Sequence, residues 1–130
     1  MVVPVKDDDA AIAELVPRLV TDPRVAEVVV VDDGSTPPLQ IPAAADAVTP
    51  VRVVRRATNG GPAAARNDGW AATTAALVAF VDADVLPSER WLDPVLAHFA
   101  DPSGAAVAPR LGGAPTDRRT DRHRGVLARY

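Results

Sequence analysis

The chain has 130 residues, of which 48% are hydrophobic and 24% charged, as expected of one folded domain rather than a disordered chain. It has no cysteine, which excludes disulfide bonds, thiolate metal sites and a cysteine nucleophile. The net charge of -3 gives no reason to expect a nucleic-acid partner. We expect no transmembrane segment and no signal peptide, because the apolar runs are short and the first residues lack a basic leader.

The first elements read as a strand followed by a helix. Met1–Val5 is a short β-branched run that favours a strand, and the aspartates at 7–9 are suited to capping a helix that starts near Ala10. Pro17 should kink or shorten this helix. Its apolar face has the spacing of a helix and consists of Ile12, Leu15, Val16 and Leu19.

The next elements continue the alternation. Val25–Val31 is a nearly continuous apolar run, as expected of a strand buried on both faces of a parallel sheet. Asp32–Pro50 reads as a loop and Val51–Val54 as a third strand. The run Asn59–Pro62 marks a turn and places a proline in the first turn of a helix that continues to about Thr73.

Ala76–Val81 predicts a fourth strand, and Ala105–Ala108 a fifth. Between them Ser88 is a candidate cap for a helix whose first turns Pro94 should disturb. The apolar stripe of that helix would be Trp91, Leu92, Val95, Leu96 and Phe99. We expect residues 1–111 to form the folded part, and residues 112–130 a basic, turn-rich and poorly packed tail.

This order of elements predicts an α/β fold with a mostly parallel sheet. Ligands of open parallel sheets bind beyond the carboxyl ends of the strands. Most of the residues at those ends are charged, and they are Lys6, Asp7, Asp32, Asp33, Gly34, Ser35, Arg55, Arg56, Asp82 and Asp84. The sequence therefore predicts a site at this rim, which requires Asp32 and Asp84 to end adjacent strands and to face one shared cleft.

Asp82-Ala83-Asp84 is the most informative triplet. Two carboxylates separated by one small residue, at the end of a buried strand, can both reach Mg²⁺ or Mn²⁺ and leave positions open for phosphate oxygens. Such a metal ion neutralises charge on a departing diphosphate. The structural alternative is a turn in which one of these aspartates bonds its own backbone.

Asp32-Asp33-Gly34-Ser35 follows the second strand. A carboxylate here can accept hydrogen bonds from a base N–H or a ribose hydroxyl, and Gly34 permits an unusual backbone angle or a close ligand. The alternative is an Asx-type turn.

Asn59–Asn67 joins a glycine-rich turn to a helix of small residues that can lie close to the sheet, with free N–H groups at its start for an anion. Arg66 could approach a diphosphate or brace Asp32 or Asp82, the alternative being a structural ion pair. Neither a Walker loop nor a Gly-x-Gly-x-x-Gly motif is present.

Four motifs in this order resemble family 2 glycosyltransferases: Val3-Pro4-Val5-Lys6-Asp7, Val31–Ser35, Asn59–Asn67 and Phe80–Asp84. The resemblance implies a GT-A (Rossmann-like) sheet with helices on both faces, and an inverting sugar transfer from a UDP-sugar with Mg²⁺ or Mn²⁺. By motif match, Pro4 and Asp7 would line the nucleoside pocket and Asp32 would contact the base. Asp82 would touch the ribose or lie beside the metal ion, and Asp84 would be its ligand.

Two segments, His98–Pro102 and Val107–Arg110, look like those of the mycofactocin-system glycosyltransferases, which implies glucose as the sugar and a peptide-derived cofactor as the acceptor. We expect a cytoplasmic location by default, because the sequence shows no targeting signal, with the inner face of the membrane as an alternative for a longer parent protein.

Inversion needs a general base on the acceptor side. No acidic residue after Asp84 matches the family motif for that base; those present are Glu89, Asp93, Asp101, Asp117 and Asp121. We therefore expect a partial GT-A domain, the donor-binding half, cut at both ends. Alone, it should bind a UDP-sugar weakly and transfer nothing. The alternative is a non-catalytic nucleotide-binding or interaction module derived from the same fold.

Overall fold

A computed structural model describes residues 1–41, 48–101 and 106–109 of the chain. The chain divides into two compact units, Met1–Pro87 and Ser88–Tyr130, which are described separately. Within the described residues, no helix has both the length and the apolar character needed to cross a membrane.

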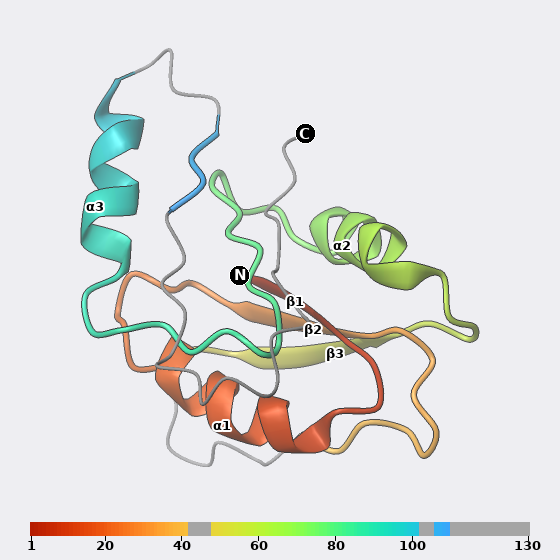
Figure 1. Cartoon of the computed structure of the whole chain (residues 1–130). Helices are drawn as coiled ribbons and strands as arrows, with labels where there is room; N and C mark the ends of the chain where they lie inside the picture. Colours follow the sequence, from red (N-terminus) through yellow and green to blue (C-terminus); the bar gives the residue numbers. More distant parts are fainter. Residues whose placement is uncertain (42–47, 102–105, 110–130) are drawn as a thin grey trace, which may run out of the picture. The chain divides into compact units, whose positions relative to one another are not determined.

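The first unit is built on a parallel sheet of three strands in the order β1 (Val2–Val5), β2 (Val28–Asp32) and β3 (Val51–Arg55) (Figure 1). These strands confirm the first three that the sequence predicts. The register places Val5 beside Asp32 and Asp32 beside Arg55, so the three strands end together. Every residue of β2 is buried, as the continuous apolar run requires.

The predicted fourth strand is much shorter than expected. Only Phe80 pairs with β1, as an isolated parallel bridge to Val2, where the Val2 N–H donates to the carbonyl of Ala79 and the Val81 N–H donates to that of Val2. The prediction of a full strand over Ala76–Val81 is therefore wrong in extent. Of the predicted fifth strand, the described residues 106–108 are not in a strand, and its first residue lies outside the described residues.

Helix α1 (Asp9–Leu19) begins where the aspartate run predicts, with Asp8 as its N-cap accepting a hydrogen bond from the N–H of Ala11 at 2.9 Å. The helix continues through Pro17, so the expectation that this proline shortens it is wrong. A proline removes one backbone donor, and burial of the apolar face outweighs that loss here. The buried residues are those predicted: Ile12, Leu15, Val16 and Leu19.

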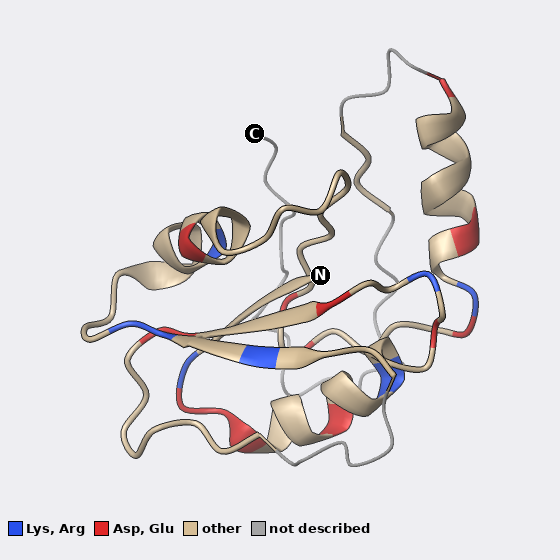
Figure 2. Cartoon of the chain, turned by 180° about the vertical axis from the view of Figure 1, so that it is seen from behind, with Lys and Arg blue, Asp and Glu red and all other residues tan. Residues whose placement is uncertain are grey.

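Helix α2 (Gly61–Ala71) lies on the opposite face of the sheet from α1, and Figures 1 and 2 agree on this from two sides. This confirms the prediction of helices on both faces. Its Ala65 joins a buried cluster with Val2, Val29 and Val31, which Phe80 packs against. A Cβ atom on Gly69 would collide with Val2 and lie 2.9 Å from Cγ2 of Val31, so the glycine lets the helix approach the sheet closely.

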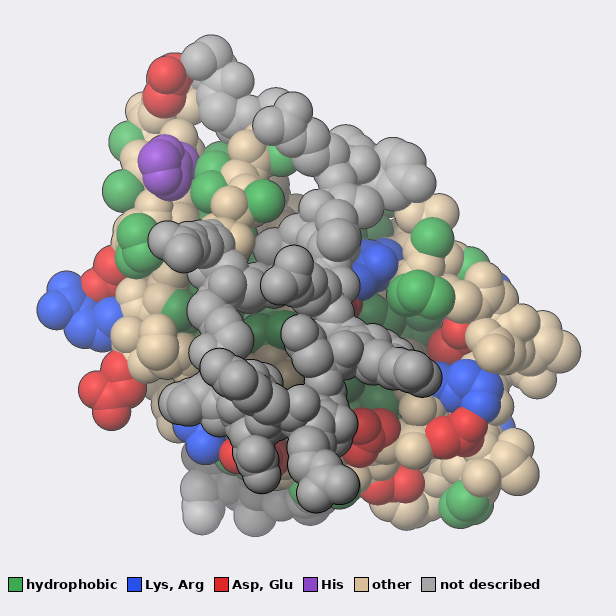
Figure 3. All heavy atoms as spheres, in the orientation of Figure 1, with side chains coloured by type: hydrophobic (Ala, Val, Ile, Leu, Met, Phe, Trp, Pro, Cys, Tyr) green, Lys and Arg blue, Asp and Glu red, His purple; other side chains and the backbone are tan. Residues whose placement is uncertain are grey.

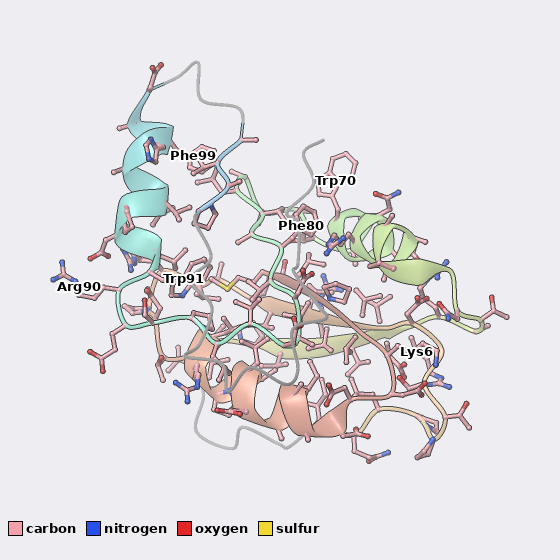
Figure 4. The ribbon with its side chains drawn as sticks, viewed as in Figure 1. Lys6, Trp70, Phe80, Arg90, Trp91 and Phe99 are labelled. Carbon is pink, nitrogen blue, oxygen red and sulfur yellow. The ribbon has the colours of Figure 1, made fainter. Side chains whose placement is uncertain are left out.

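The outer side of α2 carries exposed apolar surface. Trp70 is 64% exposed, and Figure 4 shows its ring pointing away from the sheet. Leu77 is also half exposed. The space-filling view shows apolar side chains on the surface in the region of this helix (Figure 3). Scattered exposed apolar residues are ordinary on protein surfaces.

The second unit contains α3 (Leu92–Ala97) and a 3-10 turn, η1 (His98–Ala100). The helix starts later than predicted: Trp91 is its N-cap, and Ser88 contributes only its carbonyl, which accepts from the Trp91 N–H. The expectation of a Ser88 side-chain cap is therefore wrong. Pro94 lies in the first turn, where no backbone N–H is needed for the helix. The predicted apolar stripe is buried or half-buried throughout.

Candidate functional site

The candidate site lies at the carboxyl ends of the strands in the first unit. Figure 2 shows acidic and basic residues gathered at the ends of β2 and β3 and just after β1. Most of the charged side chains here contact one another or the backbone, and these contacts decide which of them is available to a ligand.

Asp7 links the end of β1 to the loop after β2. Its carboxylate accepts a hydrogen bond from the N–H of Thr36 at 2.8 Å, and its own N–H donates to Oγ of Ser35 at 2.9 Å. The backbone of Asp7 has a φ of 53°, a left-handed conformation that is uncommon outside glycine. The hydrogen bond from the Lys6 ammonium, followed by that from Thr36, lowers the pKa of Asp7. Its side chain remains 45% exposed.

Asp32 ends β2, and its side chain is 1% exposed. Its carboxylate accepts from the N–H of Ser35 at 2.8 Å and from that of Leu39 at 3.2 Å, and it forms an ion pair with Arg55. Burial raises the pKa of Asp32, but the hydrogen bonds from Ser35 and Leu39 and the charge of Arg55 outweigh it, so the pKa is lowered. Both carboxylate oxygens are thus occupied by the chain itself, and the bond to Ser35 is a local side-chain-to-backbone bond that spans three residues, one more than an Asx turn.

Asp33 points to the other side of the sheet, toward the start of α2. Its two oxygens accept from the N–H groups of Gly60 at 2.9 Å and Gly61 at 2.8 Å, and it forms an ion pair with Arg56. Burial raises the pKa of Asp33, and these three partners lower it further than burial raises it. The expectation that the first N–H groups of this helix are free for an anion is therefore wrong for these two glycines.

Gly34 is a position where the sequence expectation is confirmed. Its φ is +76°, and a Cβ atom there would lie 2.9 Å from the backbone nitrogen of Asn59. The turn after β2 thus needs a glycine both for its backbone angle and for its contact with the turn before α2.

Arg66 and Asp82 meet between α2 and the segment after Phe80. Their ion pair joins Nη2 to Oδ1 at 2.5 Å, with both side chains about one-fifth exposed. Asp84, two residues on, is exposed and has no hydrogen bond or ion pair with any residue that the structure describes. The structure therefore brings Arg66 to Asp82, one of the two partners that the sequence offered it.

Asp32 and Asp84 do not end adjacent strands, and this part of the prediction is wrong. The segment that leads to Asp84 pairs with β1, and β1 lies between that segment and β2. Pro4, in the intervening strand, is buried beside Val31. The chain order of a parallel fold does not give the order of strands in its sheet.

Asp82 and Asp84 are the carboxylates that could hold a divalent cation together with a phosphate ligand. Within the described part of the chain, no three histidine or carboxylate side chains form a group that could hold a metal ion. Mg²⁺ is usually held by one or two carboxylates together with substrate phosphates. Asp84 offers a carboxylate without a partner among the described residues, and Asp82 has one oxygen beyond the one that Arg66 contacts.

The sequence reasoning left Arg55 and Arg56 without a role, yet they hold Asp32 and Asp33. A signal for this was present, because in-register parallel strands ending in Asp-Asp and Arg-Arg place opposite charges side by side. The alternation of a strand then sends the Asp32–Arg55 pair to one face and the Asp33–Arg56 pair to the other.

Comparison with known proteins identifies the family. The model of the family described as glycosyl transferase family 2 matches residues 1–129 of the chain. The chain belongs to glycosyl transferase family 2. This confirms the resemblance that the four ordered motifs suggested.

Proteins with similar sequences include a pre-mycofactocin glycosyltransferase of Mycobacterium tuberculosis, 43% identical over 85% of this chain and 23% of that protein. The succinoglycan biosynthesis protein ExoU of Rhizobium meliloti is 40% identical over 93% of this chain and 40% of its own length. The chain thus spans about a quarter to two-fifths of these relatives.

A crystal structure of S. aureus TarS (residues 1–349) is similar in fold, with a TM-score of 0.59 and 29% sequence identity. The similarity covers 76% of this chain and 31% of the TarS chain. The family 2 chain described here is therefore a partial GT-A domain with a parallel sheet between helices.

Proposed function

We propose that this family 2 chain is the donor-binding part of an inverting glycosyltransferase that uses a UDP-sugar and Mg²⁺ or Mn²⁺. The observation that carries the proposal is the Asp82–Asp84 segment at the end of the sheet. Asp82 is held by Arg66, whereas Asp84 is exposed with no partner among the described residues. An exposed carboxylate beside a fixed one suits a cation that also binds a diphosphate.

Each remaining site residue has a proposed role. Pro4 and Asp7 line the nucleoside pocket, Asp32 contacts the base, and Gly34 and Asp33 form the turn beside the donor. Arg66 faces the diphosphate side and fixes Asp82 near the ribose. A metal ion bound by Asp84 and Asp82 would neutralise charge on the departing diphosphate.

The base-contact role of Asp32 requires a rearrangement. In this structure its carboxylate is filled by Ser35, Leu39 and Arg55. Of these partners Arg55 is the one with an exposed side chain, so it is the one that a nucleobase can displace most easily. The apparent affinity for a donor would then equal the intrinsic affinity multiplied by the fraction of molecules in which that pair is open.

The acceptor we propose is a pre-mycofactocin peptide, with glucose as the sugar, since a relative named for pre-mycofactocin is 43% identical over 85% of this chain. The chain covers 23% of that relative. For the chain itself we expect weak donor binding and no transfer, because the residues after Asp84 offer no acidic motif for the acceptor-side base.

Calorimetric titration with UDP, with and without Mn²⁺, tests the proposal. We expect Mn²⁺ to strengthen UDP binding, and Asp84→Asn to remove at least about tenfold of that gain, or ~1.4 kcal/mol, because it removes one charged ligand. Glu14→Gln is the matched control, as Glu14 is an exposed carboxylate on α1 that pairs with Arg18.

A UDP affinity that is the same with and without Mn²⁺, and unchanged in Asp84→Asn, would contradict the proposed role of Asp84 as a metal ligand. Metal-dependent UDP binding together with sugar transfer by the 130-residue chain would show that a general base is present after all. Absence of any UDP binding would favour the interaction module instead.

A further inference from the structure

The Arg56 guanidinium joins three separate parts of the chain. It contacts Asp33 at the end of β2, and its Nε donates to Oδ2 of Asp68 in α2 at 2.6 Å. Nη1 also reaches the carbonyl of Thr58 in the turn before that helix at 3.4 Å. Arg56 itself follows β3, so one side chain connects two strand ends, a turn and a helix. Its contacts with the two carboxylates raise its pKa, so it stays charged.

The turn before α2 is shaped to receive this guanidinium. A Cβ atom on Gly60 would collide with Nη1 of Arg56 and lie 2.7 Å from Nη2 and 2.8 Å from Cζ. The backbone of Gly60 has a φ of -125°, which any residue can adopt. A larger residue here would therefore displace the Arg56 guanidinium, whereas the conformation of the backbone does not require glycine.

The same cluster holds the start of α2. Asp33 accepts hydrogen bonds from Gly60 and Gly61, and its negative charge faces the positive end of the helix dipole. Further along, Gly69 brings the helix against Val2 and Val31. Helix α2 is thus fixed at its start and at Gly69. Arg66 lies in the helix between these two points and contacts Asp82.

We propose that Arg56 is a positioning residue that directs Arg66 onto Asp82 by fixing α2 against the ends of β2 and β3. Its importance for donor binding rests on the proposed function. Its effect on the arrangement around Asp82 does not, because the contacts that carry it are all within the chain.

The first test needs no ligand. Arg56→Lys keeps the charge but cannot bridge Asp33 and Asp68 with a planar fork. We expect the backbone amide NMR signals of Asp82 and Ala83 to shift in Arg56→Lys. The same change made in an Arg66→Ala background should shift them much less, because the connecting side chain is gone. Arg18→Lys, which alters an exposed arginine on α1, is the control.

Gly60→Ala is a second variant for the case in which Arg56→Lys does not fold. It displaces the same guanidinium by steric overlap and changes no charge. It should move the Asp82 and Ala83 signals in the same direction as Arg56→Lys. Signals that shift equally with and without Arg66 in these variants would overturn the proposal.

The second test is UDP affinity in the presence of Mn²⁺. We expect Arg56→Lys to weaken it about three- to tenfold, and to have little further effect once Arg66 is alanine. If Arg56 acted only on the stability of the fold, the losses of UDP affinity caused by Arg56→Lys and Arg66→Ala would be additive. If Arg56→Lys shifts the Asp82 and Ala83 signals through Arg66 but the chain binds no UDP, the positioning role is upheld and the proposed function is rejected. Full UDP affinity in Arg56→Lys with no shift at Asp82 would reject the positioning role alone.

Discussion

Asp32 and Asp33 are neighbours in sequence but belong to opposite faces of the sheet. Asp32 is enclosed by the loop after β2 and by Arg55, whereas Asp33 caps α2 and binds Arg56. Each carboxylate is almost fully buried, and within the described residues no buried polar side-chain atom is left without a partner. Two adjacent charges thus hold together two different parts of the fold.

We expect Asp32→Asn to destabilise the chain by about 3 kcal/mol at pH 7, because it leaves Arg55 without its counter-charge and replaces one acceptor oxygen with an NH₂ donor that faces another donor. The pKa of Asp32 is lower in the fold than the value of about 3.9 in unfolded chains. Its ionisation therefore stabilises the fold above that pH, and the contribution is lost as the pH falls through the folded pKa.

Urea unfolding at several pH values measures this. The difference between the wild-type chain and Asp32→Asn should shrink as the solution is made more acidic than about pH 4. A difference that stays constant with pH would mean that the Asp32 charge does not contribute in this way. Glu14→Gln, at an exposed pair, should differ little from wild type at any of these values.

Some features of single residues could be predicted from the sequence and others could not. Strand ends and glycines could be predicted, because run length and residue type determine them locally, and Gly34 is confirmed in detail. The partners of the carboxylates could not, because they come from far along the chain: Gly60 is 27 positions from Asp33. A pattern of residue types places a charge at the rim of a sheet but does not say what neutralises it.

At the scale of elements, α2 is defined by how closely it approaches the sheet. Its interior glycine costs helix propensity, by up to about 1 kcal/mol relative to alanine. The contacts of Val2 and Val31 at that position explain why the cost is tolerated.

We expect Gly69→Ala to destabilise the chain by about 1 to 3 kcal/mol, since the added methyl group overlaps Val2 in a packed core. The double variant Gly69→Ala with Val2→Ala removes the main overlap, so it should be more stable than the sum of the two single changes. Urea unfolding of the four chains gives this comparison. If the losses in free energy of unfolding from the two single changes simply add in the double variant, α2 moves away from the sheet without strain.

The elements also show where apolar patterns mislead. Ala76–Val81 has the composition of a strand, yet only Phe80 is paired, because a strand also needs a neighbour in register along its length. Pro17 looks like the end of a helix, yet α1 continues to Leu19, since four buried side chains hold that face in place. In both cases tertiary contacts decide what local preference leaves open.

At the scale of the whole molecule, nearly all of the buried apolar residues that the structure describes belong to Met1–Pro87. That unit contains the sheet, both helices that cover it and the complete charged rim. Leu92 is the one buried apolar residue beyond it within the described residues.

We therefore expect a chain that ends at Pro87 to unfold cooperatively in urea, with a slightly lower dependence on denaturant because less surface is exposed. Circular dichroism and tryptophan fluorescence of Trp70 should report the same midpoint. A broad transition, or two midpoints that differ, would show that the residues after Pro87 are needed for the core to form.

The central strand β2 offers an internal reference for all of these comparisons. It is buried along its whole length and is flanked on both sides by hydrogen-bonded strands. Its amide protons should exchange with deuterium only when the entire unit opens, whereas those at the rim exchange through smaller openings. The slowest exchange rates in the molecule thus measure its global stability, so Asp32→Asn should speed them, whereas a variant that changes only local openings at the rim will leave them unchanged.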